Sequence, residues 1–256
     1  MRDKLQDIGN LQDSGLGVRV AQRVAAHQKS RLQVQLLRAI TQIPAGRCLV
    51  LRGAVALNRV HFNGRWSEDI DFLAPDWIAG RFSQIAAEYG LCFVEVPNSL
   101  PCYRGAGSAG VTASISVDVI SRPLRTVPGQ NGIFSSLTGE QVEVRVQPAA
   151  QILADKITCV TQRLKAADFV DLWEGLRREL VPRDLIWSFH CRRPDAQPLQ
   201  LDQILSNLDH LQVCWQDSLA PLMPAVPQFH DVRRDLCLWL PVFAGLNCSR
   251  RSQKAD

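Results

Sequence analysis

Two aspartates separated by a single residue are the feature of this sequence that is best suited to chemistry at a functional site. Asp69 and Asp71 lie in the segment 67–73, where acidic and apolar residues alternate as they do along a β-strand. Because residues i and i+2 of a strand face the same side, both carboxylates project together. Such a pair suits Mg²⁺, which takes one or two carboxylates and completes its shell with water and substrate phosphates. The solvated face of an edge strand has the same pattern, so the flanking residues must decide between these interpretations.

The flanking segments favour the metal site. Upstream, a buried strand is expected over residues 47–52, and Gly53 turns it into a helix over residues 54–60. A strand–glycine–helix turn exposes backbone N–H groups that can hold a phosphate. Downstream, Asp118 is the one carboxylate of the run 111–120, so it must be paired, bound to metal or directed to solvent. A third carboxylate supplies charge for two cations, which clamp the attacking and leaving oxygens of a phosphoryl displacement.

The elements that position these residues change character at Pro148. Before it, short strands alternate with helices, and after it the sequence suits helices alone. We therefore predict an α/β (α+β) fold. Residues 1–147 are expected to form a mixed sheet with flanking helices, one of them N-terminal. Residues 148–256 are expected to form a C-terminal helical domain. The expected strands are 47–52, 67–73, 91–96, 111–120 and 141–146, and the expected helices of the second half are 149–163, 167–180, 183–190, 199–220 and part of 224–247.

The composition excludes several other classes of protein. Of the 256 residues, 46% are hydrophobic and 21% charged, which rules out disordered, collagen-like and coiled-coil chains. A net charge of +4 is too small for a polycationic nucleic-acid coat, and the eight cysteines form no CxxC motif. The N-terminus lacks the apolar core of a signal peptide, and no apolar run reaches the roughly 18–20 residues of a membrane span. We expect a cytoplasmic protein with no membrane partner.

Several segments, in the same order along the chain, resemble the AbiEii/AbiGii-type (MenT-like) toxin nucleotidyltransferases, a branch of the DNA polymerase β-like nucleotidyltransferase superfamily. Residues 51–57, L-R-G-A-V-A-L, are similar to the family pattern L-K-G-G-T-A-L, and residues 65–72, R-W-S-E-D-I-D-F, are similar to R-F-S-E-D-I-D-F. The V-D-V segment at 117–119 follows. Residues 152–157 and 167–173 resemble the family's A-x-K helix and R-D-x-x-D-L helix. The resemblance implies a nucleotidyltransferase-like mixed sheet.

The match to the family pattern is incomplete. Arg52 stands where the family has Lys, Ala54 where it has a second Gly, and Val55 where it has a small hydroxyl residue. Ala167 replaces the usual Arg before Asp168. These departures leave open a nucleotide-binding module that has lost turnover. A D-x-D sugar-nucleotide transferase is a further alternative, although the 68 residues before the acidic pair are few for the Rossmann-like domain that it requires.

For the three strand aspartates the resemblance implies metal ligation. Asp69 and Asp71 would hold the metal bound to the nucleotide triphosphate. Asp118 would help to hold a second metal and accept the proton of the attacking hydroxyl. Mg²⁺ or Mn²⁺ is the expected cofactor.

The resemblance also implies contacts with the triphosphate. Lys156 would neutralise charge on the β- and γ-phosphates. Asp171 would hold Lys156 in place or bind near the nucleotide, and Asp168 is a second candidate for that role. Taken alone, the same lysine and aspartates would be read as solvated helix residues. Three residues near the acidic pair would contact phosphates: Arg52, Gly53 and Ser67.

The function implied by the resemblance is transfer of a nucleotidyl group from an NTP to an acceptor hydroxyl. The expected acceptor is the 3′ end of tRNA, with a protein as the other candidate. The expected setting is a type IV-like toxin–antitoxin or phage-defence system, in which a cognate antitoxin is the partner.

Overall fold

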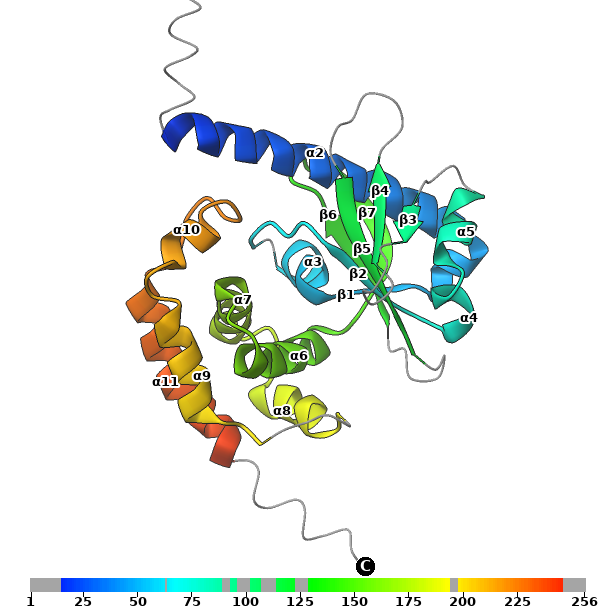
Figure 1. Ribbon diagram of the computed structural model, residues 1–256. Helices are drawn as coiled ribbons and strands as arrows, with labels where there is room; N and C mark the ends of the chain where they lie inside the picture. The colour runs from blue at the N-terminus through cyan, green and yellow to red at the C-terminus, as the bar shows by residue number, and fades with distance from the viewer. Residues whose placement is uncertain are drawn as a thin grey trace, which may run out of the picture. The chain divides into compact units, whose positions relative to one another are not determined.

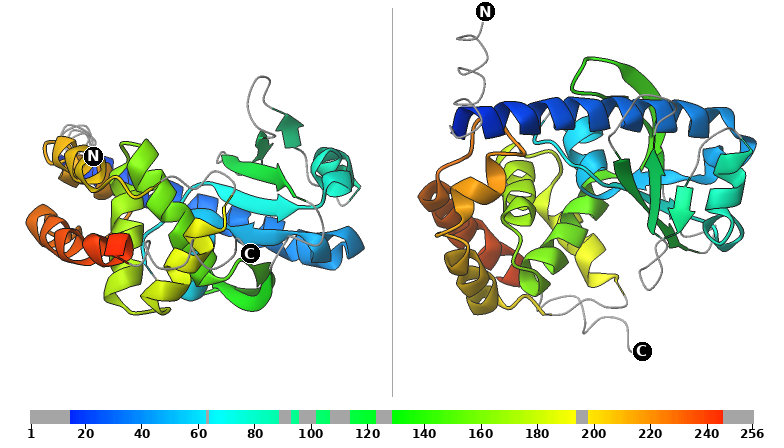
Figure 2. Two further views of the ribbon diagram at one scale, coloured as in Figure 1. Left: turned by 90° about the horizontal axis from the view of Figure 1, so that it is seen from below. Right: turned by 45° about the horizontal axis from the view of Figure 1, so that its top comes forward.

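A computed structural model gives the fold and describes residues 15–62, 64–88, 93–95, 102–106, 114–122, 129–193 and 198–245 (Figures 1 and 2). The chain divides into two units, Met1–Val146 and Gln147–Asp256. Each unit has its own set of buried apolar side chains. Within the described ranges, no helix has the length and apolar character needed to cross a membrane.

The first unit is built on a mixed sheet, which over the described residues has seven strands in the order β3-β4-β5-β2-β1-β7-β6. Two neighbouring pairs are parallel, β1 with β7 and β2 with β5, and the others are antiparallel. A mixed sheet with flanking helices confirms the predicted fold class. The strands are β1 (Val50–Arg52), β2 (Ile70–Ala74), β3 (Phe93–Glu95), β4 (Cys102–Ala106), β5 (Ser114–Ser121), β6 (Gln130–Ser135) and β7 (Gln141–Val146).

A long helix, α2 (Gly15–Gln42), lies along this sheet and contacts β5 and β7 (Figure 1). Apolar residues three or four positions apart give α2 a buried stripe that includes Leu32, Leu36 and Ile40. The stripe fixes α2 against the sheet and so fixes every polar residue that the helix carries toward the sheet. The other helical segments of the unit are short: η1 (Pro44–Cys48), α3 (Gly53–Ala56), η2 (Leu57–His61), α4 (Asp76–Ala79) and α5 (Phe82–Ala87).

Two strands begin later than the sequence predicts. The strand expected over residues 47–52 begins at Val50, because Pro44 starts a 3₁₀ turn that occupies the preceding residues. The acidic strand expected over residues 67–73 begins at Ile70. The backbone carbonyls just before it accept hydrogen bonds from a side chain of α2 and not from a neighbouring strand.

Burial along the strands follows the period of two that a half-covered sheet requires. In β7, Val142, Val144 and Val146 are buried, whereas Gln141 and Glu143 are exposed. On the opposite face, Val50 of β1 packs against Leu73 of β2, and Ile120 of β5 joins them. These alternations show which side chains share a face of the sheet.

The second unit is helical throughout its described part. Pro148 and Pro182 precede α6 and α8, where a fixed φ suits the entry to a helix. α6 contacts α7, α8 and α9, and its buried side includes Ile152 and Ile157. The helix expected over 199–220 is interrupted by a turn. The helices are α6 (Ala149–Gln162), α7 (Ala166–Arg177), α8 (Arg183–Cys191), α9 (Leu201–His210), α10 (Trp215–Leu219) and α11 (Phe229–Gly245).

Candidate active site

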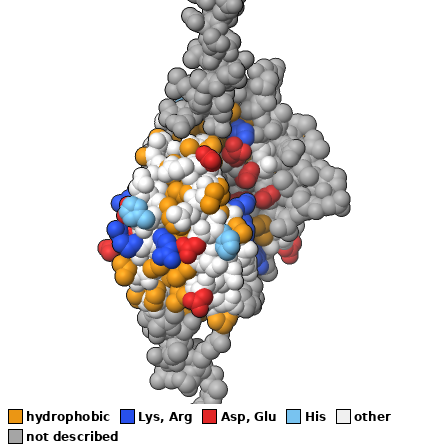
Figure 3. Space-filling model, turned by 60° about the vertical axis from the view of Figure 1, so that its left-hand side comes forward, with side chains coloured by type: hydrophobic (Ala, Val, Ile, Leu, Met, Phe, Trp, Pro, Cys, Tyr) orange, Lys and Arg blue, Asp and Glu red, His pale blue; other side chains and the backbone are white. Residues whose placement is uncertain are grey.

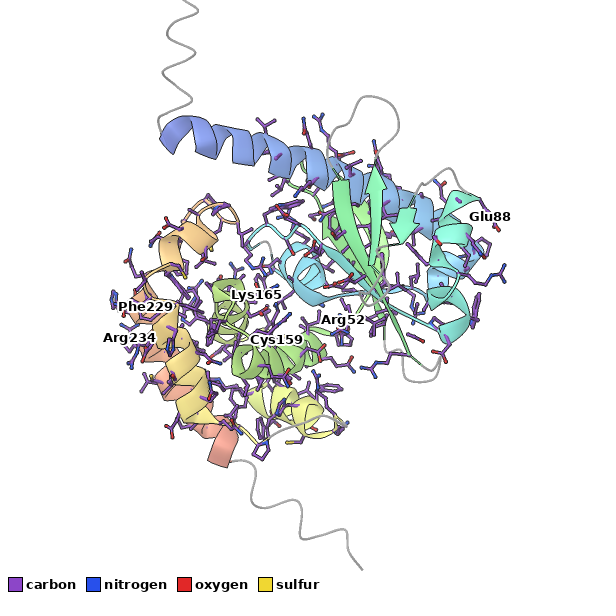
Figure 4. The ribbon with its side chains drawn as sticks, in the orientation of Figure 1. Arg52, Glu88, Cys159, Lys165, Phe229 and Arg234 are labelled. Atoms are coloured by element: carbon purple, nitrogen blue, oxygen red, sulfur yellow. The ribbon has the colours of Figure 1, made fainter. Side chains whose placement is uncertain are left out.

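The predicted carboxylates of β2 and β5 lie side by side. Asp71 is in register with Asp118 across the parallel pair β2/β5, and Arg52 of β1 is in register with Asp71 on its other side. Neighbouring strands lie roughly 4.8 Å apart, and residues in register share a face of the sheet. Arg52, Asp71 and Asp118 therefore form a row on one face, and all three are half-buried. Figure 4 labels Arg52, which is the last residue of β1.

Asp69 precedes β2 and its side chain is exposed. Among the residues that the structure describes, no three acidic, histidine or cysteine side chains gather closely enough to hold a metal ion. The structure thus brings Asp71 and Asp118 together and does not assemble a three-carboxylate cluster with Asp69. Two adjacent carboxylates still match the one or two that Mg²⁺ takes from a protein.

Gly53 is required at the turn between β1 and α3. Its φ of +69° lies in the left-handed region, which favours glycine. A Cβ atom built there would lie 2.2 Å from Asp71 Oδ2. The carboxylate of Asp71 therefore rests directly on the backbone of the turn that is expected to contact phosphates.

A glutamine of α2 anchors the segment that leads into β2. The Nε2 atom of Gln33 donates to the backbone oxygens of Ser67 at 3.0 Å and Glu68 at 3.3 Å. Lys29 of the same helix forms an ion pair with Glu68 at 2.8 Å. Gln33 is fully buried, and Ser67 is 8% exposed. The predicted phosphate residue Ser67 is thus largely covered, while its backbone is fixed by α2.

Asn58 connects the segment that follows Arg52 with the segment that leads to Asp71. Its Nδ2 atom donates to the carbonyl oxygen of Ala54 at 2.9 Å, and its Oδ1 atom accepts from the backbone N–H of Arg65 at 3.0 Å. Asn58 is 1% exposed. The prediction from sequence included neither Asn58 nor Gln33. The available signal for Gln33 was a polar residue beside Leu32 and three positions before Leu36, within an apolar stripe.

Replacing Gln33 by methionine should lower nucleotidyl transfer about tenfold while changing stability little. The change removes both hydrogen bonds that fix the segment before β2, and small displacements of positioned groups cost rate. It also removes Gln33 Oε1, a buried atom without a hydrogen-bond partner among the described residues, so the loss of stability is offset. Steady-state kinetics and thermal unfolding measure the two effects. Gln84→Met, at an exposed position of α5, is the control, and equal kinetics for both variants would contradict the anchoring role.

In the second unit, Lys156 of α6 is held by two aspartates of α7. Its Nζ atom lies 2.6 Å from Asp168 Oδ1 and 2.6 Å from Asp171 Oδ2. The three side chains are 7%, 6% and 0% exposed, in the same order. Arg163 adds a contact to Asp168 Oδ2 at 3.2 Å. Lys156 is therefore not a solvated helix residue, and both candidate aspartates contact it.

The surroundings of this buried cluster keep Cys159 protonated. Burial raises the pKa of the Cys159 thiol, and Asp168 adds to the rise, whereas Lys156 and Arg163 oppose it. Figure 4 labels Cys159, which belongs to α6. Since the thiolate is the reactive form of cysteine, Cys159 is not placed to act as a nucleophile at neutral pH.

Lys156→Met should destabilise the protein by about 3–5 kcal/mol, the usual cost of removing one partner of a buried ion pair. The substitution leaves Asp168 and Asp171 buried and adjacent with no ammonium between them. Adding Asp171→Asn to Lys156→Met should restore part of the loss, because it removes one of the two carboxylates. Denaturant unfolding of the single and double variants measures the change. A loss below about 1 kcal/mol, as for exposed pairs, would contradict this assignment.

Comparison with known proteins identifies the family and the fold. The model of the family described as nucleotidyl transferase AbiEii toxin, type IV toxin–antitoxin system, matches residues 35–236. The fold is similar to MenT4, a nucleotidyltransferase toxin from Mycobacterium tuberculosis H37Rv, with 18% identity and a TM-score of 0.61 over 90% of this chain and 91% of that one. It is also similar to JHP933 from Helicobacter pylori, with 17% identity and a TM-score of 0.51 over 84% and 92%. No curated protein matches the sequence.

The family match spans most of the chain and includes the carboxylates of β2 and β5 as well as the lysine of α6. At 17–18% identity, the similarity to the two solved structures shows the fold alone. The chain therefore belongs to the AbiEii family of nucleotidyl transferase toxins of type IV toxin–antitoxin systems, and it is a nucleotidyltransferase.

Proposed function

We propose that this nucleotidyltransferase moves a nucleotidyl group from an NTP to the 3′-terminal hydroxyl of a tRNA in a metal-dependent reaction that releases pyrophosphate. The observation that carries the proposal is the position of Asp71, which lies beside Asp118 and rests on the backbone of Gly53. Carboxylates and a phosphate-binding turn then meet at one place, as a reaction on a triphosphate requires.

The residues present fit a divalent cation. Two adjacent carboxylates repel each other, and a cation between them relieves the repulsion. Asp71 and Asp118 would hold Mg²⁺ or Mn²⁺, with Asp69 as the third expected ligand. When bound, such an ion neutralises phosphate charge and makes the attacking hydroxyl more acidic.

The chain's own groups have separate tasks in this proposal. Asp118 accepts the proton of the attacking hydroxyl. Lys156 neutralises charge on the β- and γ-phosphates, and its carboxylate partners in α7 keep its ammonium in place. The residues expected to contact the phosphates are Arg52, Gly53 and Ser67.

The acceptor and the biological setting rest on the family. A type IV toxin–antitoxin system contains an antitoxin as well as the toxin, so we expect a cognate antitoxin gene beside this one. NTPs and tRNA are both cytoplasmic, so the reaction belongs in the cytoplasm. Modification of the 3′ end would stop aminoacylation of the tRNA and so explain toxicity.

The test is incubation with each α-³²P-labelled NTP, Mg²⁺ and total tRNA. Label in the RNA, lost when EDTA removes the metal, is the expected result. Label on a protein would replace tRNA by a protein acceptor. Retention of nucleotide without transfer would identify a binding module that has lost turnover. Transfer of a labelled sugar from UDP-glucose under the same conditions would favour a D-x-D sugar-nucleotide transferase.

A further inference from the structure

A hollow of about 530 Å³ lies on the first unit, where β6 and β7 meet the chain between α2 and β1. Arg145 and Glu143 of β7 line it, together with Asn131 and Ile133 of β6 and Arg47 of η1. None of these residues belongs to the row of charged groups described above. The hollow is therefore a separate feature of the same unit.

The strand register places the hollow on the same face of the sheet as that row. Leu51 of β1 is level with Val146 of β7, so the next residue down each strand, Val50 and Arg145, is level as well and faces the other side. The surroundings of Gly129 agree, because a Cβ atom there would lie 2.8 Å from Val50 Cγ2 and 3.1 Å from Arg145 Nη2. Val50 in turn stands two residues before Arg52 and so shares its face.

The same register gives the spacing between the hollow and the carboxylates. Arg145 is two strand positions from Asp71, because β1 lies between β7 and β2. It is also two residues lower along the strands. With strands about 4.8 Å apart and a rise of about 3.3 Å per residue, the Cα atoms of Arg145 and Asp71 lie roughly 12 Å apart.

The charge in the hollow favours an anion. Within the described residues, neither Arg47 nor Arg145 forms an ion pair with a carboxylate, and Arg145 Nη1 donates to the backbone oxygen of Arg47 at 3.0 Å. Glu143 is the one acidic residue that lines the hollow. The guanidinium groups therefore exceed the carboxylates by one, and they are free to contact phosphate oxygens.

Several arginines of the second unit have a carboxylate partner. In the second unit, Arg233 pairs with Asp209 at 2.6 Å, and Arg178 pairs with Glu174 at 2.5 Å. Figure 3 shows basic and acidic side chains close to one another on the face that it presents. These guanidinium groups already contact a carboxylate, whereas those of Arg47 and Arg145 do not within the described residues.

We propose that the hollow holds the phosphate backbone of the RNA acceptor, upstream of the 3′ end that reacts at Asp71 and Asp118. The inference rests on the proposed function, in which the acceptor is RNA. Arg47 and Arg145 contact phosphates, and the amide of Asn131 adds a hydrogen-bond donor. Ile133, which is 51% exposed, offers an apolar surface to the face of a base. In the proposed function the phosphates of the NTP contact Gly53, so we assign the hollow to the acceptor.

Binding of a short fluorescein-labelled single-stranded oligoribonucleotide, followed by anisotropy at low salt, tests the proposal without requiring turnover. Arg145→Gln and Arg47→Gln should each raise the Kd for this RNA about three- to tenfold. Each should reduce the slope of log K against log salt by about 0.7, the value for one phosphate contact to a single strand. Glu143→Gln should act in the opposite direction and tighten binding, because it removes the one negative charge of the hollow. Arg81→Gln, on an exposed turn of the same unit, is the control with the same change in net charge.

Three results would overturn the proposal. The first is no RNA binding by the wild-type protein, and the second is equal effects of Arg145→Gln and Arg81→Gln. The third is that Arg145→Gln and Arg47→Gln raise the Kd for NTP or for inorganic phosphate and leave the Kd for RNA unchanged. That result would assign the hollow to the donor nucleotide or to free phosphate. If label is transferred to tRNA while these variants behave as the control, the proposed function stands and only the hollow is wrong. If no label is transferred but the RNA affinities shift as expected, the reverse holds.

Discussion

Asp71→Asn is expected to lower nucleotidyl transfer about a hundred- to a thousandfold, the scale of effect seen when a group that stabilises transition-state charge is removed. The substitution keeps the shape of the side chain and deletes the charge that faces Asp118 across β2 and β5. Transfer of labelled nucleotide at saturating NTP and Mg²⁺ measures it. Glu88→Gln, an exposed acidic residue of the same unit labelled in Figure 4, should retain full activity.

The same variant gives an independent readout in the metal-free protein. Loss of one of two adjacent carboxylates removes their repulsion, so Tm should rise in EDTA. Adding Mg²⁺ should raise the Tm of the wild type, since a ligand of the native state stabilises it, and should have little effect on Asp71→Asn. Near-wild-type activity in Mg²⁺ together with an unchanged response of Tm to Mg²⁺ would remove Asp71 from the metal site.

Gly53→Ala is the second substitution with a large expected effect, at least a hundredfold loss of transfer. An alanine Cβ would lie 2.2 Å from Asp71 Oδ2, so the carboxylate has to leave its position. A displacement of about 1 Å in a reacting group can cost a hundredfold in rate. The positive φ adds a conformational cost of about 1–2 kcal/mol to unfolding stability.

Gly139→Ala separates these two costs. Gly139 also has a positive φ, +84°, but a Cβ there meets nothing within 4 Å. The variant Gly139→Ala therefore has the conformational cost without displacing a carboxylate. We expect similar falls in stability for the two variants and a loss of activity for Gly53→Ala alone. Equal activities, measured at a temperature where both variants are folded, would show that the contact between Gly53 and Asp71 does not matter for transfer.

The sequence indicates the residues of the candidate site but not the contacts that hold them. Asp71 and Asp118 are recognisable because alternation along a strand and a single acid among β-branched residues are local patterns. Gln33 acts on the segment before β2 from a helix that is 34 residues distant in the chain. No periodicity of α2 specifies that partner, because the contact exists only once the helix has packed on the sheet.

Strand β6 illustrates a different limit. Its sequence, Q-N-G-I-F-S, contains few residues with high strand propensity and does not predict a strand. It forms because every residue from Gln130 to Ser135 pairs with β7, whose own pattern is strong. The hollow proposed to bind RNA depends on this strand, so the residues that line it could not be assembled from the sequence.

The order of the strands determines when during translation this toxin can become active. β1 ends at Arg52, whereas its parallel neighbour β7 ends at Val146 and is synthesised much later. β2 is likewise synthesised before its parallel neighbour β5. Emergence of residues 50–74 from the ribosome therefore leaves both strands without their parallel partners, and no row of Asp71 and Asp118 exists on the nascent chain. Pairings so distant in sequence are slow to form, because loop closure precedes the contacts that reward it. The nascent chain therefore cannot assemble the row of Asp71 and Asp118 until β5 and β7 have been synthesised.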